Sequence, residues 1–148
     1  MENHIFAVVW ICLGMASYED LRDRRVREGW IWCIAGAGIS RLWLGEGKEA
    51  WDVLLGGCVA FLLFVLILLW FPGAFGGGDV KLYAAAGLSL GPVGAGVGLA
   101  VAILTAGVAL LLSPSFREQK EIPFVPFLSV GIFLGFCFGE QIQNWYLS

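Results

Sequence analysis

Residues 53–71, VLLGGCVAFLLFVLILLWF, form a run of 19 positions without a charged side chain. A helix needs about 20 apolar residues to cross the ~30 Å hydrocarbon core of a bilayer. The whole 148-residue chain shares this character, because 59% of its residues are hydrophobic and only 14% are charged. Soluble domains carry about 25% charged residues. The sequence therefore predicts an all-α fold, a polytopic bundle of membrane-spanning helices.

Further apolar runs on both sides of this segment bring the expected number of transmembrane helices to about six. The run at 79–92 is the shortest, since it would cover only ~20 Å at about 1.5 Å per residue before Gly91-Pro92 breaks it. A short helix and a bent hairpin fit this run equally well. No internal repeat divides the chain, so residues 1–148 are expected to form a single domain. The six spans are expected near residues 4–19, 29–44, 51–71, 79–92, 94–113 and 122–139.

Glycine is unusually abundant, with 21 residues. Small residues spaced four apart let membrane helices approach closely. We therefore expect most of the glycines to serve helix packing. Pairs with this spacing occur at Gly87/Gly91, Gly94/Gly98 and Gly131/Gly135.

Lys and Arg are distributed unevenly between the two sides of the predicted bundle. The loops after the first, third and fifth spans hold seven of the nine basic residues, and only Arg41 and Lys48 fall on the other side. Basic residues concentrate in cytoplasmic loops. We therefore expect these three loops to lie in the cytoplasm and both termini to lie outside the cytoplasmic membrane.

The composition also argues against several kinds of site. The net charge is −3 and no basic tract exceeds two residues, so nucleic-acid binding is not expected. The four cysteines lie far apart in apolar segments and form no CxxC pair, which predicts neither a zinc site nor a disulfide framework. No metal or other cofactor is expected, and the sequence does not define an oligomeric state.

Two acids, Asp20 and Asp79, stand at ends of predicted spans on the expected cytoplasmic side. An acidic side chain is costly to place at membrane depth, so an acid found there indicates a functional site. Residues 72–78, PGAFGGG, end the third helix and place Asp79 at the start of the fourth. Two carboxyls within ~3–4 Å share a proton. Such a pair suits amide hydrolysis, because one member can take a proton from water while the other donates one.

Two motifs contain these acids: Asp20-Leu-Arg-Asp-Arg-Arg-Val and, later in the chain, Gly76-x-Gly78-Asp79-x-Lys81. They resemble the first aspartate motif and the GxGD motif of the type IV prepilin and preflagellin peptidases, which are membrane aspartyl proteases with six transmembrane helices. The run 122–128, which contains Pro123 and Pro126, is similar to a late Pro-rich signature. The resemblance implies a catalytic pair of Asp20 and Asp79, with the two glycines, Lys81 and the two prolines shaping the site.

The resemblance further implies an endopeptidase that cuts the short basic leader of a prepilin-like protein, a class III signal, at the cytoplasmic membrane face. Arg27-Glu28 stands where the family usually has Pro-Asn, so the family's loop geometry and substrate preference do not carry over to this chain from the motif. The family's N-terminal domain with paired CxxC motifs has no counterpart in the chain. A minimal peptidase form without N-methyltransferase activity is therefore expected.

Simpler interpretations remain open for these residues. A helix cap explains Asp79, a salt bridge with Arg24 explains Asp20, and a membrane anchor explains Lys81. A proton- or ion-conducting protein would also place two acids in the membrane. A non-catalytic scaffold that binds pilin-like helices is the third alternative.

A basic leader would be repelled by the Arg-rich loop unless acids on the same side compensate. Five acids are available there, and we expect them to help dock the leader. They are Glu19, Asp23, Glu28, Glu118 and Glu121.

Overall fold

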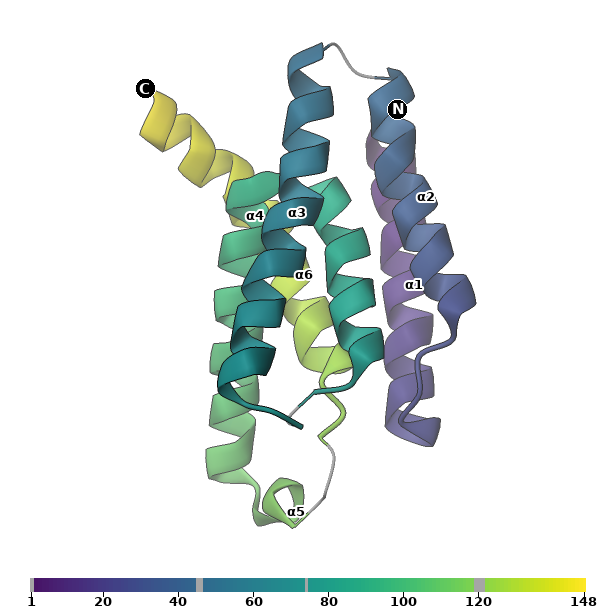
Figure 1. The fold of residues 1–148 in the computed structure, drawn as a ribbon, viewed down its shortest axis with the longest axis vertical. Coiled ribbons are helices and arrows are strands. Elements are labelled where there is room, and N and C mark those ends of the chain that lie inside the picture. The colour runs from purple at the N-terminus through teal and green to yellow at the C-terminus, as the bar shows by residue number, and fades with distance from the viewer. Residues whose placement is uncertain (1, 45–46, 74, 119–121) are drawn as a thin grey trace.

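The computed structural model describes the backbone of residues 2–44, 47–73, 75–118 and 122–148, and every regular element in these ranges is an α-helix (Figure 1). In chain order the helices are α1 (Glu2–Asp23), α2 (Glu28–Leu44), α3 (Gly47–Trp70), α4 (Gly77–Leu112), α5 (Pro114–Arg117) and α6 (Val125–Leu147).

Four of the described helices, α1, α3, α4 and α6, are long and apolar enough to cross a membrane. Their outer faces carry exposed large apolar side chains such as Trp70, Leu104 and Leu111. Such a surface would be a liability in water but suits contact with lipid. The all-α membrane bundle predicted from the sequence is therefore confirmed.

Helix α4 reverses its direction at Gly91. The backbone there has φ 74° and ψ 173°, and glycine adopts this positive φ without steric cost. The hydroxyl of Tyr83 donates a hydrogen bond of 2.5 Å to the carbonyl oxygen of Ala95, although twelve residues of straight helix would span ~18 Å. The two halves of α4 are therefore antiparallel (Figure 1). They match the predicted spans at 79–92 and 94–113.

Replacing Tyr83 by Phe should loosen this hairpin. The Tyr83 side chain is fully buried, and losing its hydrogen bond should cost about 1 kcal/mol, or a fall in Tm of about 2–4 °C for a chain of this size. Thermal unfolding in detergent micelles measures the change. Tyr18→Phe is the matched control because Tyr18 is exposed. Equal Tm values for the two variants would contradict the role of the hydrogen bond.

The predicted glycine pairs lie where helices pack most closely. A Cβ added to Gly131 of α6 would collide with the carbonyl oxygen of Gly98 in α4. One added to Gly135 would collide with the carbonyl oxygen of Gly94. The second half of α4 and α6 thus approach backbone to backbone, as small-residue motifs allow.

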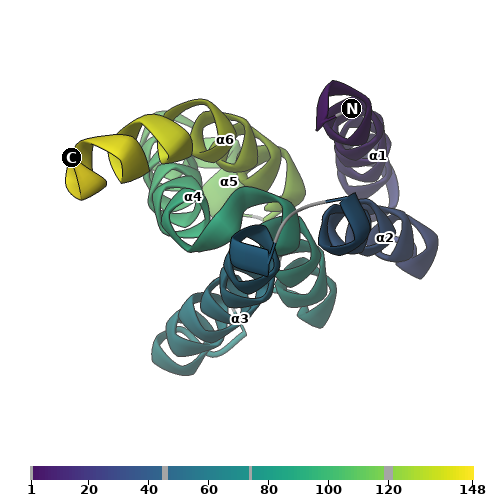
Figure 2. The ribbon, with the colours of Figure 1, turned by 90° about the horizontal axis from the view of Figure 1, so that it is seen from above.

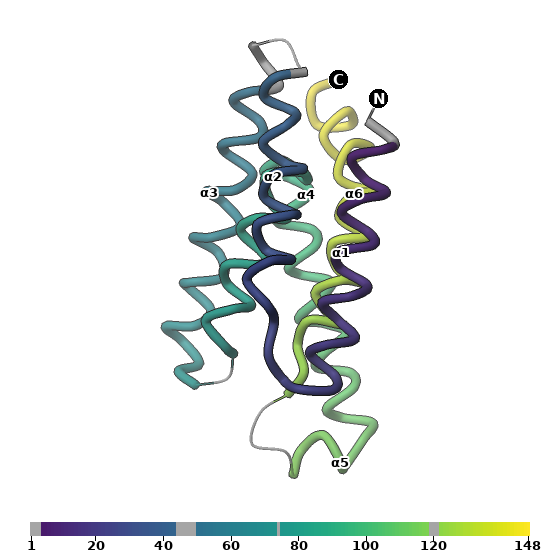
Figure 3. Tube along the Cα trace, turned by 90° about the vertical axis from the view of Figure 1, so that its right-hand side faces the viewer, coloured from purple at the N-terminus to yellow at the C-terminus, as the bar shows by residue number. Residues whose placement is uncertain are grey.

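Helix α4 occupies the middle of the bundle and packs against α3, α6 and α2 (Figure 2). Helix α1 lies against α2 and α6. The turns after α1 and α3 and the start of α6 gather at the lower end in Figure 1, whereas the chain termini lie toward the upper end (Figure 3). This arrangement brings the end of α1 close to the starts of α4 and α6.

Candidate active site

Asp20 lies in the last turn of α1, and its side chain is held against the start of α6. Its Oδ2 accepts a hydrogen bond of 3.2 Å from the backbone N–H of Val125, the first residue of α6. The N–H groups of a first helical turn have no partner within the helix, so a carboxylate suits this position. Asp20 is only 6% exposed. Deeper in the bundle, the hydroxyls of Ser17 and Ser129 link the same two helices at 2.7 Å.

Asp79 is the third residue of α4 and follows the glycine turn. Its Oδ2 accepts a hydrogen bond of 3.3 Å from the backbone N–H of Gly76, as in a capping box. The helix-cap interpretation of Asp79 is therefore correct as far as it goes. Capping does not exclude a further role, however, because Asp79 lines a cavity together with Asp20. Asp79 is 8% exposed.

Both carboxylates line one cavity of about 340 Å³. This volume is large enough for several water molecules or a short stretch of extended peptide. Its walls come from the end of α1 with the turn that follows it, from the turn between α3 and α4, and from the segment before α6. The lining residues are Asp20, Arg24, Arg25, Val26, Gly73, Phe75, Gly76, Gly78, Asp79 and Ile122.

Two guanidinium groups share this cavity with the acids. Arg24 has a positive φ of 52°, and its backbone N–H donates a hydrogen bond of 2.9 Å to the carbonyl oxygen of Asp20. Both residues line the cavity, and the alternative that pairs their side chains in a salt bridge stays a prediction. Arg25 lines the cavity as well, so the site contains both signs of charge.

The other motif residues fall into two groups. Gly76 and Gly78 line the cavity, and the buried Pro123 and half-buried Pro126 stand beside the first residue of α6. Pro at the start of a helix leaves no hydrogen bond unmade. Lys81 does not line the cavity. Its Nζ lies 3.4 Å from Oε1 of Glu28, and its side chain is 64% exposed.

The acids predicted to dock a leader occupy different surroundings. Glu19 is engaged within the chain: its Oε2 accepts a hydrogen bond of 2.9 Å from Nε1 of Trp30, and its Oε1 lies 3.5 Å from Nε of Arg27. Asp23 and Glu118 are exposed. Glu28 pairs with Lys81 but is 73% exposed. Glu121 lies outside the described residues.

Sequence reasoning missed the apolar wall of the cavity. Phe75 lines the cavity, and its ring packs at a tilt against that of Phe124 with centroids 4.5 Å apart, while both rings pack edge-on near Phe64 of α3. These rings fix the glycine turn against the segment that precedes α6. In the sequence, Phe75 lies in the run 72–78 and Phe124 in the run 122–128. Aromatic residues are too common in membrane proteins for these two to be singled out.

A helical membrane bundle with two acidic residues lining one cavity at one end defines a class of candidate intramembrane acid–base enzymes. Comparison with known proteins gives the family. The chain matches the type IV leader peptidase family over residues 7–113, more than half of its length, and it belongs to that family. The resemblance stated from the sequence motifs is thus confirmed.

Individual relatives agree with this assignment. The chain is 30% identical to a prepilin leader peptidase/N-methyltransferase of Bacillus subtilis over 98 residues, covering 64% of this chain and 40% of the relative. It is also 30% identical to proteins of the same description from Aeromonas salmonicida and Aeromonas hydrophila, covering 95% of this chain and 51% of each relative. The chain therefore spans about half or less of the length of these relatives. No solved structure matches it.

Proposed function

We propose that this protein is a membrane aspartic endopeptidase that removes the short basic leader of prepilin-like proteins. The observation that carries this proposal is the convergence of Asp20 and Asp79, which are 59 positions apart in sequence, on one cavity at one end of the bundle. Membership of the type IV leader peptidase family supports the same reaction.

The geometry suits direct attack by water on the scissile carbonyl group. The ionised carboxylate of the pair removes a proton from the water molecule while its oxygen attacks the carbonyl carbon. The protonated carboxyl donates to the developing oxyanion and, as the tetrahedral intermediate collapses, a proton passes to the leaving amine. Both carboxyls are held by backbone N–H donors, at Val125 and at Gly76. They are therefore oriented before substrate binds.

The cavity would open toward the cytoplasm. The loops around it carry most of the Lys and Arg residues, and cytoplasmic loops are enriched in these residues. The substrate's leader would then meet the site on the side where prepilin-like proteins are made, with both termini of this chain on the opposite side of the membrane.

Incubation of the detergent-purified protein with a prepilin tests this function. Mass spectrometry should show a single cut that separates the basic leader from the hydrophobic segment. Binding of the prepilin without any cut would instead favour the scaffold alternative. An aspartate-dependent current in proteoliposomes without peptidase activity would favour ion conduction, although most of the largest fully buried side chains, such as Leu13, Phe64 and Leu128, are apolar.

The exposed acids near the site should help to bind a basic leader. Asp23→Asn combined with Glu118→Gln should raise KM for a basic leader peptide about 3- to 10-fold at low salt, because each exposed charge pair contributes about 0.2–1 kcal/mol. The rise should shrink at high salt. Glu140→Gln is the matched control, since Glu140 is exposed near the other end of α6. An unchanged KM for the double variant at low salt would remove these acids from leader docking.

A further inference from the structure

A second hollow opens on the lipid-facing side of the bundle. This lateral groove has a volume of about 620 Å³, with α2 and α3 as its sides and the first half of α4 as its floor. Trp32, Leu54 and Phe61 stand at its rim and are 73%, 48% and 48% exposed. Small residues, Ala84 and Ala85, line the floor. From Lys81 to Leu88 the groove follows α4 for two helical turns, or ~10 Å.

The groove begins beside the candidate active site. Its lower mouth is formed by Glu28 and Lys81. Glu28 comes two residues after Val26, and Lys81 comes two residues after Asp79, and both of these preceding residues line the carboxylate cavity. Val26 also lies within van der Waals distance of a Cβ built on Gly78, so the turn after α1 and the start of α4 meet beside the groove's mouth.

We propose that the lateral groove seats the hydrophobic segment of the substrate, the part of a prepilin-like protein that follows the cut. This inference rests on the proposed function and adds where the uncut part of the substrate binds. An apolar helix can lie in an apolar groove with its side chains against the rim, and small residues on the floor let it approach closely. Its N-terminal end would then emerge at the mouth, next to the two aspartates.

Charge at the mouth favours a peptide with a basic leader over a phospholipid. Lys81 is already paired with Glu28 at 3.4 Å, so binding a phosphate headgroup would require Lys81 to give up this partner. A basic residue that precedes the hydrophobic segment can instead join the pair, because Glu28 is 73% exposed and has a second carboxylate oxygen to offer. A lipid chain is the competing occupant that the experiments must separate.

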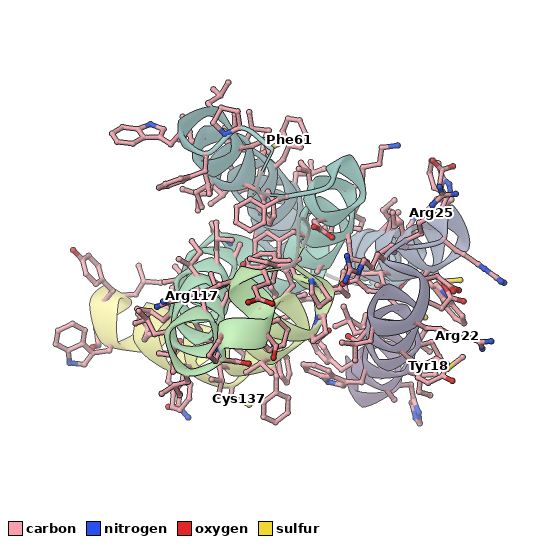
Figure 4. The ribbon with its side chains drawn as sticks, turned by 90° about the horizontal axis from the view of Figure 1, so that it is seen from below. Tyr18, Arg22, Arg25, Phe61, Arg117 and Cys137 are labelled. Atoms are coloured by element: carbon pink, nitrogen blue, oxygen red, sulfur yellow. The ribbon has the colours of Figure 1, made fainter. Side chains whose placement is uncertain are left out.

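Native cysteines allow a direct test. Cys58 lines the groove, whereas Cys137 is exposed on α6. Figure 4 shows Cys137 and the rim residue Phe61 on opposite sides of the bundle. A protein that keeps Cys58 and has Cys33→Ser and Cys137→Ser should form a disulfide, under an added oxidant, with a prepilin carrying one cysteine in its hydrophobic segment. A protein that keeps Cys137 and has Cys33→Ser and Cys58→Ser should not. Equal cross-linking of the two proteins would overturn the proposal.

Filling the groove gives an independent kinetic readout. Cys58→Trp should raise KM for a full prepilin about tenfold with little change in kcat, because one large anchor site is blocked. A peptide that ends just after the cut lacks the hydrophobic segment, so its kcat/KM should not change. Cys137→Trp, the matched control, should leave both substrates unaffected.

These experiments distinguish a failure of the groove proposal from a failure of the proposed function. An unchanged prepilin KM in Cys58→Trp would reject the groove as the docking site while cleavage itself stood. Loss of activity toward both substrates by the same factor would also reject it, since it would indicate a distorted fold or a displaced lipid. Failure of the unmodified protein to cut either substrate would instead reject the proposed function.

Discussion

Asp20→Asn and Asp79→Asn are each expected to lower kcat for leader cleavage by about 10³-fold or more. General acid–base groups contribute about 10²–10⁴-fold each, and here both members of the pair are needed to move protons. Asn retains the size of Asp and an acceptor oxygen for the N–H donors at Val125 and Gly76. It cannot accept and release a proton at working pH. Single-turnover cleavage of a prepilin, followed by mass spectrometry, measures the loss.

The double variant gives a sharper result than either single change. Residues that act as one catalytic unit show non-additive losses, so Asp20→Asn with Asp79→Asn should be about as inactive as the worse single variant. Asp52→Asn is the matched control, because Asp52 lies near the start of α3, at the end of the bundle away from the cavity. Normal cleavage by either single variant of the pair would end the proposed mechanism.

Gly131→Leu is expected to have the largest effect on the fold. A side chain at this position would collide with the backbone of Gly98 and with Ala102, both in the second half of α4. Overpacking costs about 1–3 kcal/mol where side chains can move aside, and a backbone cannot do so without separating the helices. We therefore expect a loss of at least about 3 kcal/mol, seen as aggregation or early thermal unfolding in detergent.

The same substitution elsewhere in the α4–α6 region provides the control. A Cβ added to Gly107 of α4 meets no atom within 4 Å. Gly107→Leu should therefore unfold within a few degrees of the unmodified protein, about 1 kcal/mol or less. Similar Tm values for Gly131→Leu and Gly107→Leu would contradict the close packing of α4 on α6. Activity of Gly131→Leu should fall with its folded fraction, because α6 supplies the N–H that holds Asp20.

The sequence was sufficient for the class of fold and for the convergence of the two acids. The bilayer sets the length and composition that a membrane-spanning helix must have, so such helices can be recognised in a sequence without knowledge of tertiary contacts. The Lys and Arg distribution and the span count placed Asp20 and Asp79 at the same end. Gly91-Pro92 indicated a break, and of the two alternatives for residues 79–92 the structure has the short helix, which turns at Gly91 into the next span.

Side-chain partners were harder to predict because they depend on distances between helices. Lys81 and Asp79 share one motif, but residues two apart on a helix point in different directions. The Lys81 side chain therefore lies outside the cavity and pairs with Glu28. Glu19 was grouped with the exposed acids, yet it binds Trp30 and Arg27 within the chain. No pattern in the sequence predicts these pairings.

The backbone N–H groups that hold the two carboxylates could not be predicted from the sequence either. Every residue other than proline carries an N–H group, and only the fold decides which of them meets a carboxylate. The donor for Asp20 comes from Val125, 105 positions away. The aromatic wall made by Phe75 and Phe124 likewise exists only once the glycine turn packs on the start of α6.

Cross-linking between the two aspartate positions tests most directly whether they share one water-accessible cavity. In a variant with all four native cysteines replaced, Asp20→Cys and Asp79→Cys should be bridged within one chain by the shortest water-soluble bifunctional thiol reagents. Mass spectrometry of the linked peptides would detect the bridge. The control pair, Asp20→Cys with Asp52→Cys, should not be bridged. We expect rapid bridging of positions 20 and 79 alone. Bridging that needs long reagents, or no bridging while each thiol reacts singly, would contradict a shared cavity.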